Sequence, residues 1–162
     1  MNSNALFAPW RIEYILGPKT GGCFLCAALA ADDERAHLLL HRGKTCAVIM
    51  NRYPYSCGHL MVITNRHVET LAQMTPEERA EMMELTHRCV EILADAMTPH
   101  GFNTGLNLGK VAGAGLQDHI HQHVVPRWTG DTNFMAATGS TSIIPQALDE
   151  LYAILRPRFD RL

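Results

Sequence analysis

His119-Ile120-His121-Gln122-His123-Val124-Val125 is the stretch of this chain that constrains the fold and the chemistry most. It holds three of the nine histidines of a 162-residue sequence within five positions. Side chains alternate between the two faces of a β-strand, so a strand here would project the three imidazoles to one side. Each buried imidazole needs partners for a donor and an acceptor nitrogen, so a row of three is costly unless it performs a task. The pattern therefore predicts a functional strand rather than a solvated, histidine-rich one.

Two tasks are compatible with such a row of histidines. Neutral imidazole is a common zinc ligand, so the row could bind metal. Alternatively, an imidazole with a pKa near ~6.5 is substantially neutral at pH 7 and can attack phosphorus, and the phosphorylated imidazolium is then a good leaving group. The glycine-rich segment 109–115 lets backbone N–H groups approach a phosphate closely, although it has neither the P-loop nor the dinucleotide-binding pattern. Its position before the row favours phosphate chemistry over metal binding alone.

Helices are expected on both sides of this strand. The clearest begins at Thr75, where Thr75 and Glu78 can form a capping box around Pro76. Apolar residues then recur at three- and four-residue spacing until Pro99 stops the helix. A second helix is expected over about 145–157, and a shorter one over about 24–31.

Five short apolar or alternating segments between the helices are predicted to be strands. They are Ala36–His41, Thr45–Met50, Leu60–Thr64, Thr104–Leu108 and Ile120–Val125. Most of their connections are too short for parallel crossovers, so the sheet should be mainly antiparallel. We therefore expect an α+β fold of about five strands with one long helix and a C-terminal helix.

The composition limits the domain organisation and the partners. Hydrophobic residues make up 47% of the chain and charged residues 19%, with 14 Lys+Arg against 16 Asp+Glu. We expect a single domain over 1–162, and the near-neutral charge predicts no nucleic-acid partner. No apolar run approaches the roughly 18 residues of a membrane span, and the N-terminus lacks a signal-peptide pattern. Five cysteines, an odd number, suit a reducing compartment, so a cytoplasmic protein without a membrane partner is expected.

The histidine row resembles the His-x-His-x-His-x-x motif of the histidine triad (HIT) nucleotide-binding proteins. Upstream, Asn51–Ile63 is similar to the Pro-x-x-x-Gly-His segment with which a strand of that family begins. Ala8–Arg11 and His123–Met135 are similar to the bacterial branch that contains diadenosine tetraphosphate phosphorylases. The resemblance covers about residues 8–135. It implies an α+β domain that is commonly a homodimer, with sheets continuous across the interface.

The resemblance also implies a role for each histidine of the motif. His121 would be the nucleophile that takes the nucleoside monophosphate, His123 would contact the phosphate and help the leaving group depart, and His119 would brace the arrangement. The implied enzyme acts on dinucleoside polyphosphates or related nucleoside 5′-phosphate derivatives through a covalent nucleotidyl-histidine. Adenine would be favoured, and inorganic phosphate or water would be the acceptor. Two alternatives stay open: a non-catalytic nucleotide sensor or scaffold, and a metal-binding protein that uses the triad histidines.

Substrate contacts follow from the same resemblance. Asn51 matches a ribose-binding position, His59 would lie beside the phosphates, and Asn107 matches a phosphate-side amide. Many members carry Gln and then Ser or Thr shortly before the motif, where this chain has Gly115-Leu116 followed by Gln117. Gly115 and Gln117 are therefore candidate contacts, and the backbone N–H of Gly115 or Leu116 would replace the missing hydroxyl or amide.

Cys23-Phe24-Leu25-Cys26 is a lone CxxC pair, compatible with half a zinc site, a redox pair or two buried thiols. Some bacterial members of the resembled family complete a structural zinc site with two histidines, which match His67 and His119 here. Four thiolate and imidazole ligands suit structural zinc. Such a site would orient the strand that carries His121 without being a catalytic metal. The other three cysteines are expected to be core or near-surface thiols.

Overall fold

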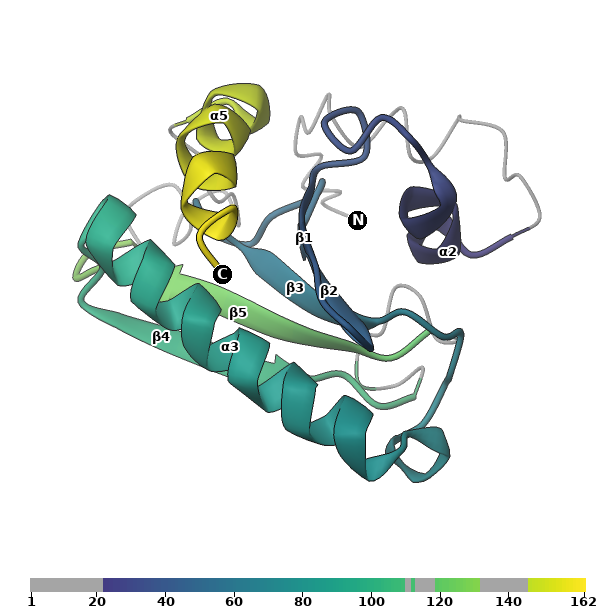
Figure 1. Ribbon diagram of the computed structural model, residues 1–162. Coiled ribbons are helices and arrows are strands. Elements are labelled where there is room, and N and C mark those ends of the chain that lie inside the picture. Colours follow the sequence, from purple (N-terminus) through teal and green to yellow (C-terminus); the bar gives the residue numbers. More distant parts are fainter. Residues whose placement is uncertain (1–21, 110–111, 113–118, 132–145) are drawn as a thin grey trace, which may run out of the picture.

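The computed structural model describes residues 22–109, 112, 119–131 and 146–162 (Figure 1). Its elements follow one another as α2 (Phe24–Ala30), β1 (Leu39–Arg42), β2 (Cys46–Met50), β3 (Leu60–Thr64), η1 (Leu71–Gln73), α3 (Pro76–Met97), β4 (Gly101–Leu106), β5 (His121–Arg127) and α5 (Leu148–Phe159).

The five strands form one antiparallel sheet in the order β1-β2-β3-β5-β4, which confirms the predicted α+β class. The register between β3 and β5 pairs Ile63 with His121 and Met61 with His123. Directly opposed residues of an antiparallel pair project to the same face of the sheet. His121 and His123 therefore lie on the face that carries Met61 and Ile63.

Helices α3 and α5 cover one face of this sheet, and α2 lies against the other (Figure 1). The larger core lies under α3 and α5, where Val62 and Val124 of the strands share a cluster with Leu93 and Leu155 of the helices. A smaller core joins α2, through Leu25, to the opposite face of the sheet. The two β5 histidines thus lie on the α2 side, away from the main core.

Helix α3 begins as predicted and is anchored to the sheet one turn later. The Thr75 side chain accepts a hydrogen bond from the backbone N–H of Glu78, and the Glu78 carboxylate accepts one from the backbone N–H of Thr75. The Glu81 carboxylate accepts hydrogen bonds from the backbone N–H groups of Lys44 (2.7 Å) and Cys46 (3.1 Å). These bonds tie the helix to the turn between β1 and β2.

Two elements begin or end elsewhere than expected. Strand β1 begins at Leu39 rather than Ala36, because Leu38 adopts a positive φ of 59° that interrupts extended backbone. Helix α5 runs through Pro157 to Phe159, so the predicted stop near Pro157 is wrong. The fully buried Phe159 ring packs in the core and holds the last turn in place.

The paired strands β4 and β5 are also displaced from the predicted segments. Strand β4 lies toward the N-terminal side of 104–108, and β5 begins at His121 and continues through Pro126. Their ladder extends to the pair formed by Gly101 and Arg127, and this tertiary pairing outweighs the local proline signal. Because β5 begins at His121, His119 lies just before the strand rather than in it.

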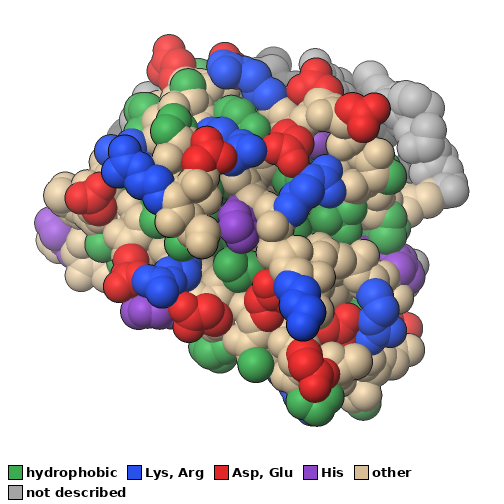
Figure 2. Space-filling view, in the orientation of Figure 1, with side chains coloured by type: hydrophobic (Ala, Val, Ile, Leu, Met, Phe, Trp, Pro, Cys, Tyr) green, Lys and Arg blue, Asp and Glu red, His purple; other side chains and the backbone are tan. Residues whose placement is uncertain are grey.

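The face on which α3 and α5 lie carries acidic and basic side chains intermixed (Figure 2). The helices themselves carry such ion pairs: Asp149 of α5 pairs with Arg35 at 2.8 Å, and Glu84 and Arg88 pair within α3 at 3.0 Å. No helix in the described part of the chain is long and apolar enough to cross a bilayer.

Candidate functional site

His121 is the first residue of β5 and is buried on the α2 side of the sheet. Its Nδ1 lies 2.8 Å from the carbonyl oxygen of His119. A carbonyl oxygen only accepts, so Nδ1 of the neutral ring donates this hydrogen bond and Nε2 keeps its lone pair. This is the tautomer in which Nε2 can act as a nucleophile.

A second pair of imidazoles lies beside His121. Nε2 of His59, just before β3, lies 2.9 Å from Nδ1 of His123. Nδ1 of His59 accepts a hydrogen bond from the backbone N–H of Tyr55 at 3.1 Å, so the proton of His59 is on Nε2 and is donated to His123. The proton of His123 is therefore on its own Nε2. With the His121 and His123 ring centroids 4.9 Å apart, a free lone pair and an N–H donor occupy neighbouring rings.

Two asparagines that the resemblance offers as substrate contacts, Asn51 and Asn107, lie beside these imidazoles. The side-chain nitrogen of Asn51 lies 3.3 Å from Nδ1 of His59 and reinforces the Tyr55 contact. The side-chain amide of Asn107 lies 3.3 Å from Nε2 of His123. The atom at this distance is the amide nitrogen. Because Nε2 carries a proton, a half-turn of the amide plane, which exchanges nitrogen and oxygen, would present the acceptor that this proton needs.

Burial keeps the His59–His123 pair uncharged at neutral pH. His59 is 2% exposed, and desolvation, reinforced by His123 and His121, lowers its pKa to about 3. Desolvation, together with the neighbouring His121, lowers the pKa of His123 to about 4. Both rings are therefore neutral at pH 7, as the chain of tautomers requires.

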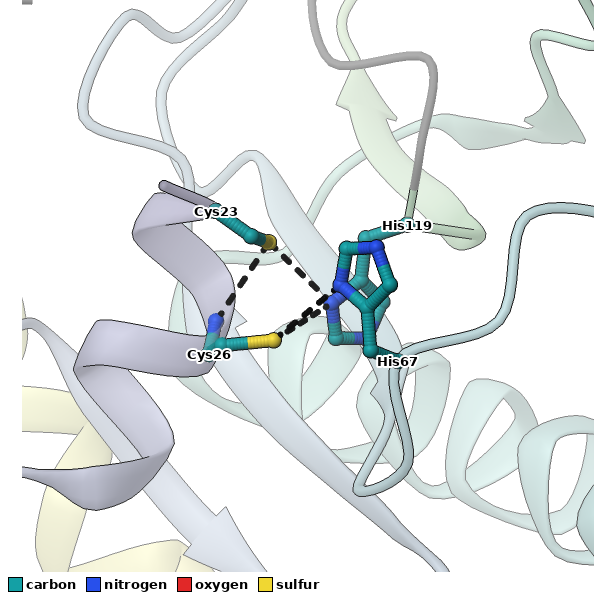
Figure 3. Close-up of side chains that lie close together, drawn as sticks. All are labelled: Cys23, Cys26, His67 and His119. Carbon is teal, nitrogen blue, oxygen red and sulfur yellow. Dashed lines mark hydrogen bonds between the residues drawn. The ribbon is translucent and has the colours of Figure 1, made fainter. Parts of the chain in front are cut away.

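A separate group of four side chains lies between α2 and the start of β5 (Figure 3). Cys23, Cys26, His67 and His119 each offer one ligand atom, and these atoms all lie within 4.8 Å of one another. Nδ1 of His119 lies 3.3 Å from Sγ of Cys23 and 3.5 Å from Sγ of Cys26, and Nδ1 of His67 lies 3.2 Å from Sγ of Cys26. A zinc tetrahedron with Zn–S of about 2.3 Å and Zn–N of about 2.0 Å separates neighbouring ligand atoms by about 3.5 Å, so the four donors fit this metal.

The surroundings of His119 favour metal ligation. Its ring is fully buried, and its Nε2 donates a hydrogen bond to the carbonyl oxygen of Thr64 at 2.8 Å. This contact leaves the lone pair on Nδ1, the atom that faces the thiols. Metal-ligating histidines almost always donate their other ring N–H to an oxygen in this way.

The three histidines of the motif thus divide between two groups. The His119 ring lies 5.1 Å from the His67 ring, in the Cys/His group, whereas the His121 ring lies against His123. This differs from the expected single row, because His119 precedes the strand. Of the three, His119 alone belongs to the metal-ligating group in the described residues, which gives no support to a metal held by all three.

Two predicted contacts, Gly115 and Gln117, lie outside the described residues. Conversely, the sequence did not reveal the parts played by Tyr55 and Thr64. The backbone N–H of Tyr55 sets the tautomer of His59, and the Tyr55 ring lies 4.6 Å from the His59 ring. The backbone carbonyl of Thr64 likewise sets the tautomer of His119. Both residues set the tautomers through backbone atoms, which a pattern of residue types does not encode.

A family model described as the HIT domain matches residues 33–130. The chain belongs to the HIT domain family. This HIT protein is 44% identical over 130 residues to a protein named AP-4-A phosphorylase from Mycobacterium tuberculosis. The alignment covers 80% of this chain and 66% of that relative, so the chain spans slightly less than two thirds of the relative's length.

Two further proteins are similar to this HIT protein. A bis(5′-nucleosyl)-tetraphosphatase (asymmetrical) from Schizosaccharomyces pombe is 28% identical over 93 residues, which cover 57% of this chain and 50% of that one. A crystal structure described as a Zn-bound histidine triad family protein from Mycobacterium smegmatis superimposes with a TM-score of 0.69 at 27% identity. That superposition covers 86% of this chain and 94% of the other.

Proposed function

We propose that this HIT protein is an enzyme that transfers a nucleoside monophosphate group through a covalent intermediate on His121. The observation that carries the proposal is the 2.8 Å contact from Nδ1 of His121 to the His119 carbonyl, which leaves a lone pair on Nε2. The neighbouring His123 presents a proton on Nε2 because His59 occupies its Nδ1. A nucleophile and an acid on adjacent rings suit a two-step displacement at phosphorus.

In the first step, Nε2 of His121 attacks the α-phosphorus of a nucleoside 5′-polyphosphate. The P–N bond forms while the P–O bond to the leaving phosphate chain breaks, and the Nε2–H of His123 donates a hydrogen bond to the departing oxygen. In the second step, inorganic phosphate or water attacks the same phosphorus and the P–N bond breaks. His121 then returns to its neutral form, and the proton of the acceptor passes to solvent.

A dinucleoside polyphosphate with adenine as the favoured base is the substrate class that we propose. One relative is named AP-4-A phosphorylase and another bis(5′-nucleosyl)-tetraphosphatase, which supports this class. The higher identity to the phosphorylase, 44% against 28%, favours inorganic phosphate as the acceptor. The proposed substrate contacts are Asn51, Asn107, Gly115 and Gln117. His59 was expected beside the phosphates, but Tyr55 and His123 occupy both of its ring nitrogens, so we propose that it acts through His123.

A turnover assay with diadenosine tetraphosphate, with and without inorganic phosphate, tests the proposal. Phosphate-dependent formation of ADP plus ATP identifies a phosphorylase, and AMP plus ATP in both conditions identifies a hydrolase with the same intermediate. His121→Asn should abolish turnover, whereas His87→Asn, at an exposed position on α3, should not change it. Nucleotide binding without turnover would instead identify a non-catalytic sensor.

We further propose that Cys23, Cys26, His67 and His119 hold a structural zinc ion. When bound, the metal would cross-link the start of α2, the loop after β3 and the segment that precedes β5. Elemental analysis should find one zinc per chain, retained in Cys57→Ser and lost in Cys26→Ser. Because the thiols must stay reduced to bind metal, we place the protein in a reducing compartment such as the cytoplasm.

A homodimer that continues the sheet across β4 is the assembly that we propose. Strand β4 is the last strand of the sheet in the described residues, and Asn103, Thr104 and Gly105 are exposed. At the opposite edge, the Tyr152 hydroxyl of α5 already donates a hydrogen bond to the Leu39 carbonyl of β1. An uncovered strand edge is a template for pairing with another chain.

A further inference from the structure

His119 makes two different contacts, one through its side chain and one through its backbone. The ring supplies Nδ1 to the Cys/His group, 3.3 Å from Sγ of Cys23. The carbonyl oxygen of the same residue accepts the hydrogen bond from Nδ1 of His121 at 2.8 Å. One residue therefore connects the candidate metal group directly to the candidate nucleophile.

The carbonyl contact decides which nitrogen of His121 is reactive. In water, the neutral ring of free histidine prefers to carry its proton on Nε2. The His119 carbonyl reverses that preference, because only a proton on Nδ1 satisfies the 2.8 Å contact. If this carbonyl moved away, the proton would return to Nε2 and occupy the atom that must attack phosphorus.

The position of the carbonyl depends on how firmly His119 is held. Its ring has one protein anchor at Nε2, the Thr64 carbonyl at 2.8 Å, and the thiols at Nδ1. The next residue, Ile120, donates its N–H to the Val68 carbonyl at 2.7 Å, in the loop that also carries His67. A metal ion shared by His119 and His67 would therefore fix both sides of this connection.

We propose that His119 is a positioning residue that couples metal occupancy of the Cys/His group to the tautomer of His121. With zinc bound, the His119 carbonyl is held in place and Nε2 of His121 keeps its lone pair. Without zinc, Nδ1 of His119 keeps only its contacts with the two thiols in place of a metal bond, so the ring is held less firmly and His121 redistributes its proton toward Nε2. The importance of this coupling for catalysis rests on the function proposed above, but the coupling itself can be observed without any substrate.

Long-range ¹H–¹⁵N spectra of protein labelled with ¹⁵N-histidine test this coupling, because they distinguish the two tautomers of each ring. At a constant pH of 7.5, protein loaded with one equivalent of zinc should show His121 protonated at Nδ1. Removal of zinc with a chelator should shift its ¹⁵N signals toward the Nε2–H pattern. The signals of His59 should stay unchanged and serve as an internal control, since its tautomer is set by Tyr55. The signals that are absent from the spectrum of His121→Asn are assigned to His121.

Variants at two exposed histidines provide the matched comparison. His67→Asn in the presence of zinc should give the His121 signals of the metal-free protein, whereas His87→Asn should give those of the zinc-loaded protein. Turnover by metal-free protein should show a kcat lower by about tenfold or more with an unchanged KM, as expected for a residue that positions another.

Two results would overturn the proposal. The first is an unchanged His121 tautomer after zinc is removed from a protein whose backbone spectrum stays folded. The second is global unfolding on zinc removal, since the metal would then hold the whole fold rather than one imidazole. A zinc-dependent tautomer in a protein that turns over no nucleotide would uphold the coupling and reject the proposed function. Full turnover together with a His121 tautomer that does not depend on zinc would reject the coupling and uphold the proposed function.

Discussion

At the scale of single residues, backbone groups decide which nitrogen of each imidazole is available. The Tyr55 N–H puts the proton of His59 on Nε2, and that proton occupies Nδ1 of His123. Nε2 of His123 is left as the donor nearest to His121, whose own proton is held by the His119 carbonyl. In the proposed reaction, His59 therefore acts through His123.

Substitution of His59 tests this chain of hydrogen bonds. His59→Gln keeps an N–H group that can reach Nδ1 of His123, whereas His59→Leu removes it. We expect the leucine variant to lose about 10- to 100-fold in kcat, in the range of a positioned acid–base residue, and the glutamine variant to retain about tenfold more activity. Steady-state kinetics with diadenosine tetraphosphate provide the comparison. Equal kcat values for the two variants would contradict the role of the donated proton.

Acidification should destabilise the metal-free protein. In the unfolded chain, His59 and His123 bind protons near pH ~6.5, whereas their pKa values in the folded protein are about 3 and about 4. Below that pH the unfolded state binds more protons, so the free energy of unfolding decreases as the pH falls, by about 2 kcal/mol per imidazole at pH 5. Above pH ~6.5, the two imidazoles are neutral in both the folded and the unfolded protein, so they contribute no pH dependence to the free energy of unfolding.

Urea unfolding at pH 7.5 and pH 5, with a chelator present, measures this loss. Carboxylates also titrate in this range, so the comparison with His59→Gln isolates the imidazole. The variant should show a smaller decrease in unfolding free energy between the two pH values than the parent protein. An equal decrease in both proteins would show that His59 is not held neutral by the fold.

At the scale of elements, the start of α3 holds the loop that carries His67. The Arg66 guanidinium donates hydrogen bonds to the buried Glu78 carboxylate at 2.7 and 2.8 Å, and to the Gln73 carbonyl at 3.1 Å. The same carboxylate caps the helix through the N–H of Thr75. A capping residue of α3 thus also fixes the position of the loop that carries His67, a candidate metal ligand.

Arg66→Lys should therefore weaken zinc binding. Lysine keeps the charge but cannot reproduce the forked contact with Glu78, so the loop that carries His67 is held less firmly. We expect the dissociation constant for zinc to rise by up to about tenfold, as for other residues that support a metal ligand. Competition with a chromophoric chelator measures it. Arg88→Lys, on the exposed side of α3, is the matched control and should bind zinc like the parent protein.

At the scale of the whole molecule, the outer edge of β4, which pairs with no further strand in the described part of the chain, predicts a concentration-dependent dimer. Thr104→Lys places a charge in the middle of this edge, where an exposed side chain does not disturb the core. Sedimentation velocity should show a dimer for the parent protein and mainly a monomer for the variant. Circular dichroism should show that the variant stays folded. A parent protein that is monomeric at all concentrations would contradict this assembly.

Several features of this molecule followed from the sequence by itself, because they depend on residues close together in the chain. The spacing of His119, His121 and His123, the capping residues Thr75 and Glu78, and the CxxC pair identified the family motif, the long helix and half of the metal group. The antiparallel sheet followed from short connections between apolar segments. In each case the determining physics is local, namely backbone periodicity, helix capping or the short length of a connection.

The tertiary structure alone decided how these residues are shared between the two sites. It brings Cys23 to His119 across 96 positions of sequence, and it separates His119 from the other two motif histidines. It also sets each tautomer, because the carbonyl of His119 and the N–H of Tyr55 act irrespective of their side chains. Such contacts depend on strand pairing and loop closure over long distances, which no local pattern of residue types specifies.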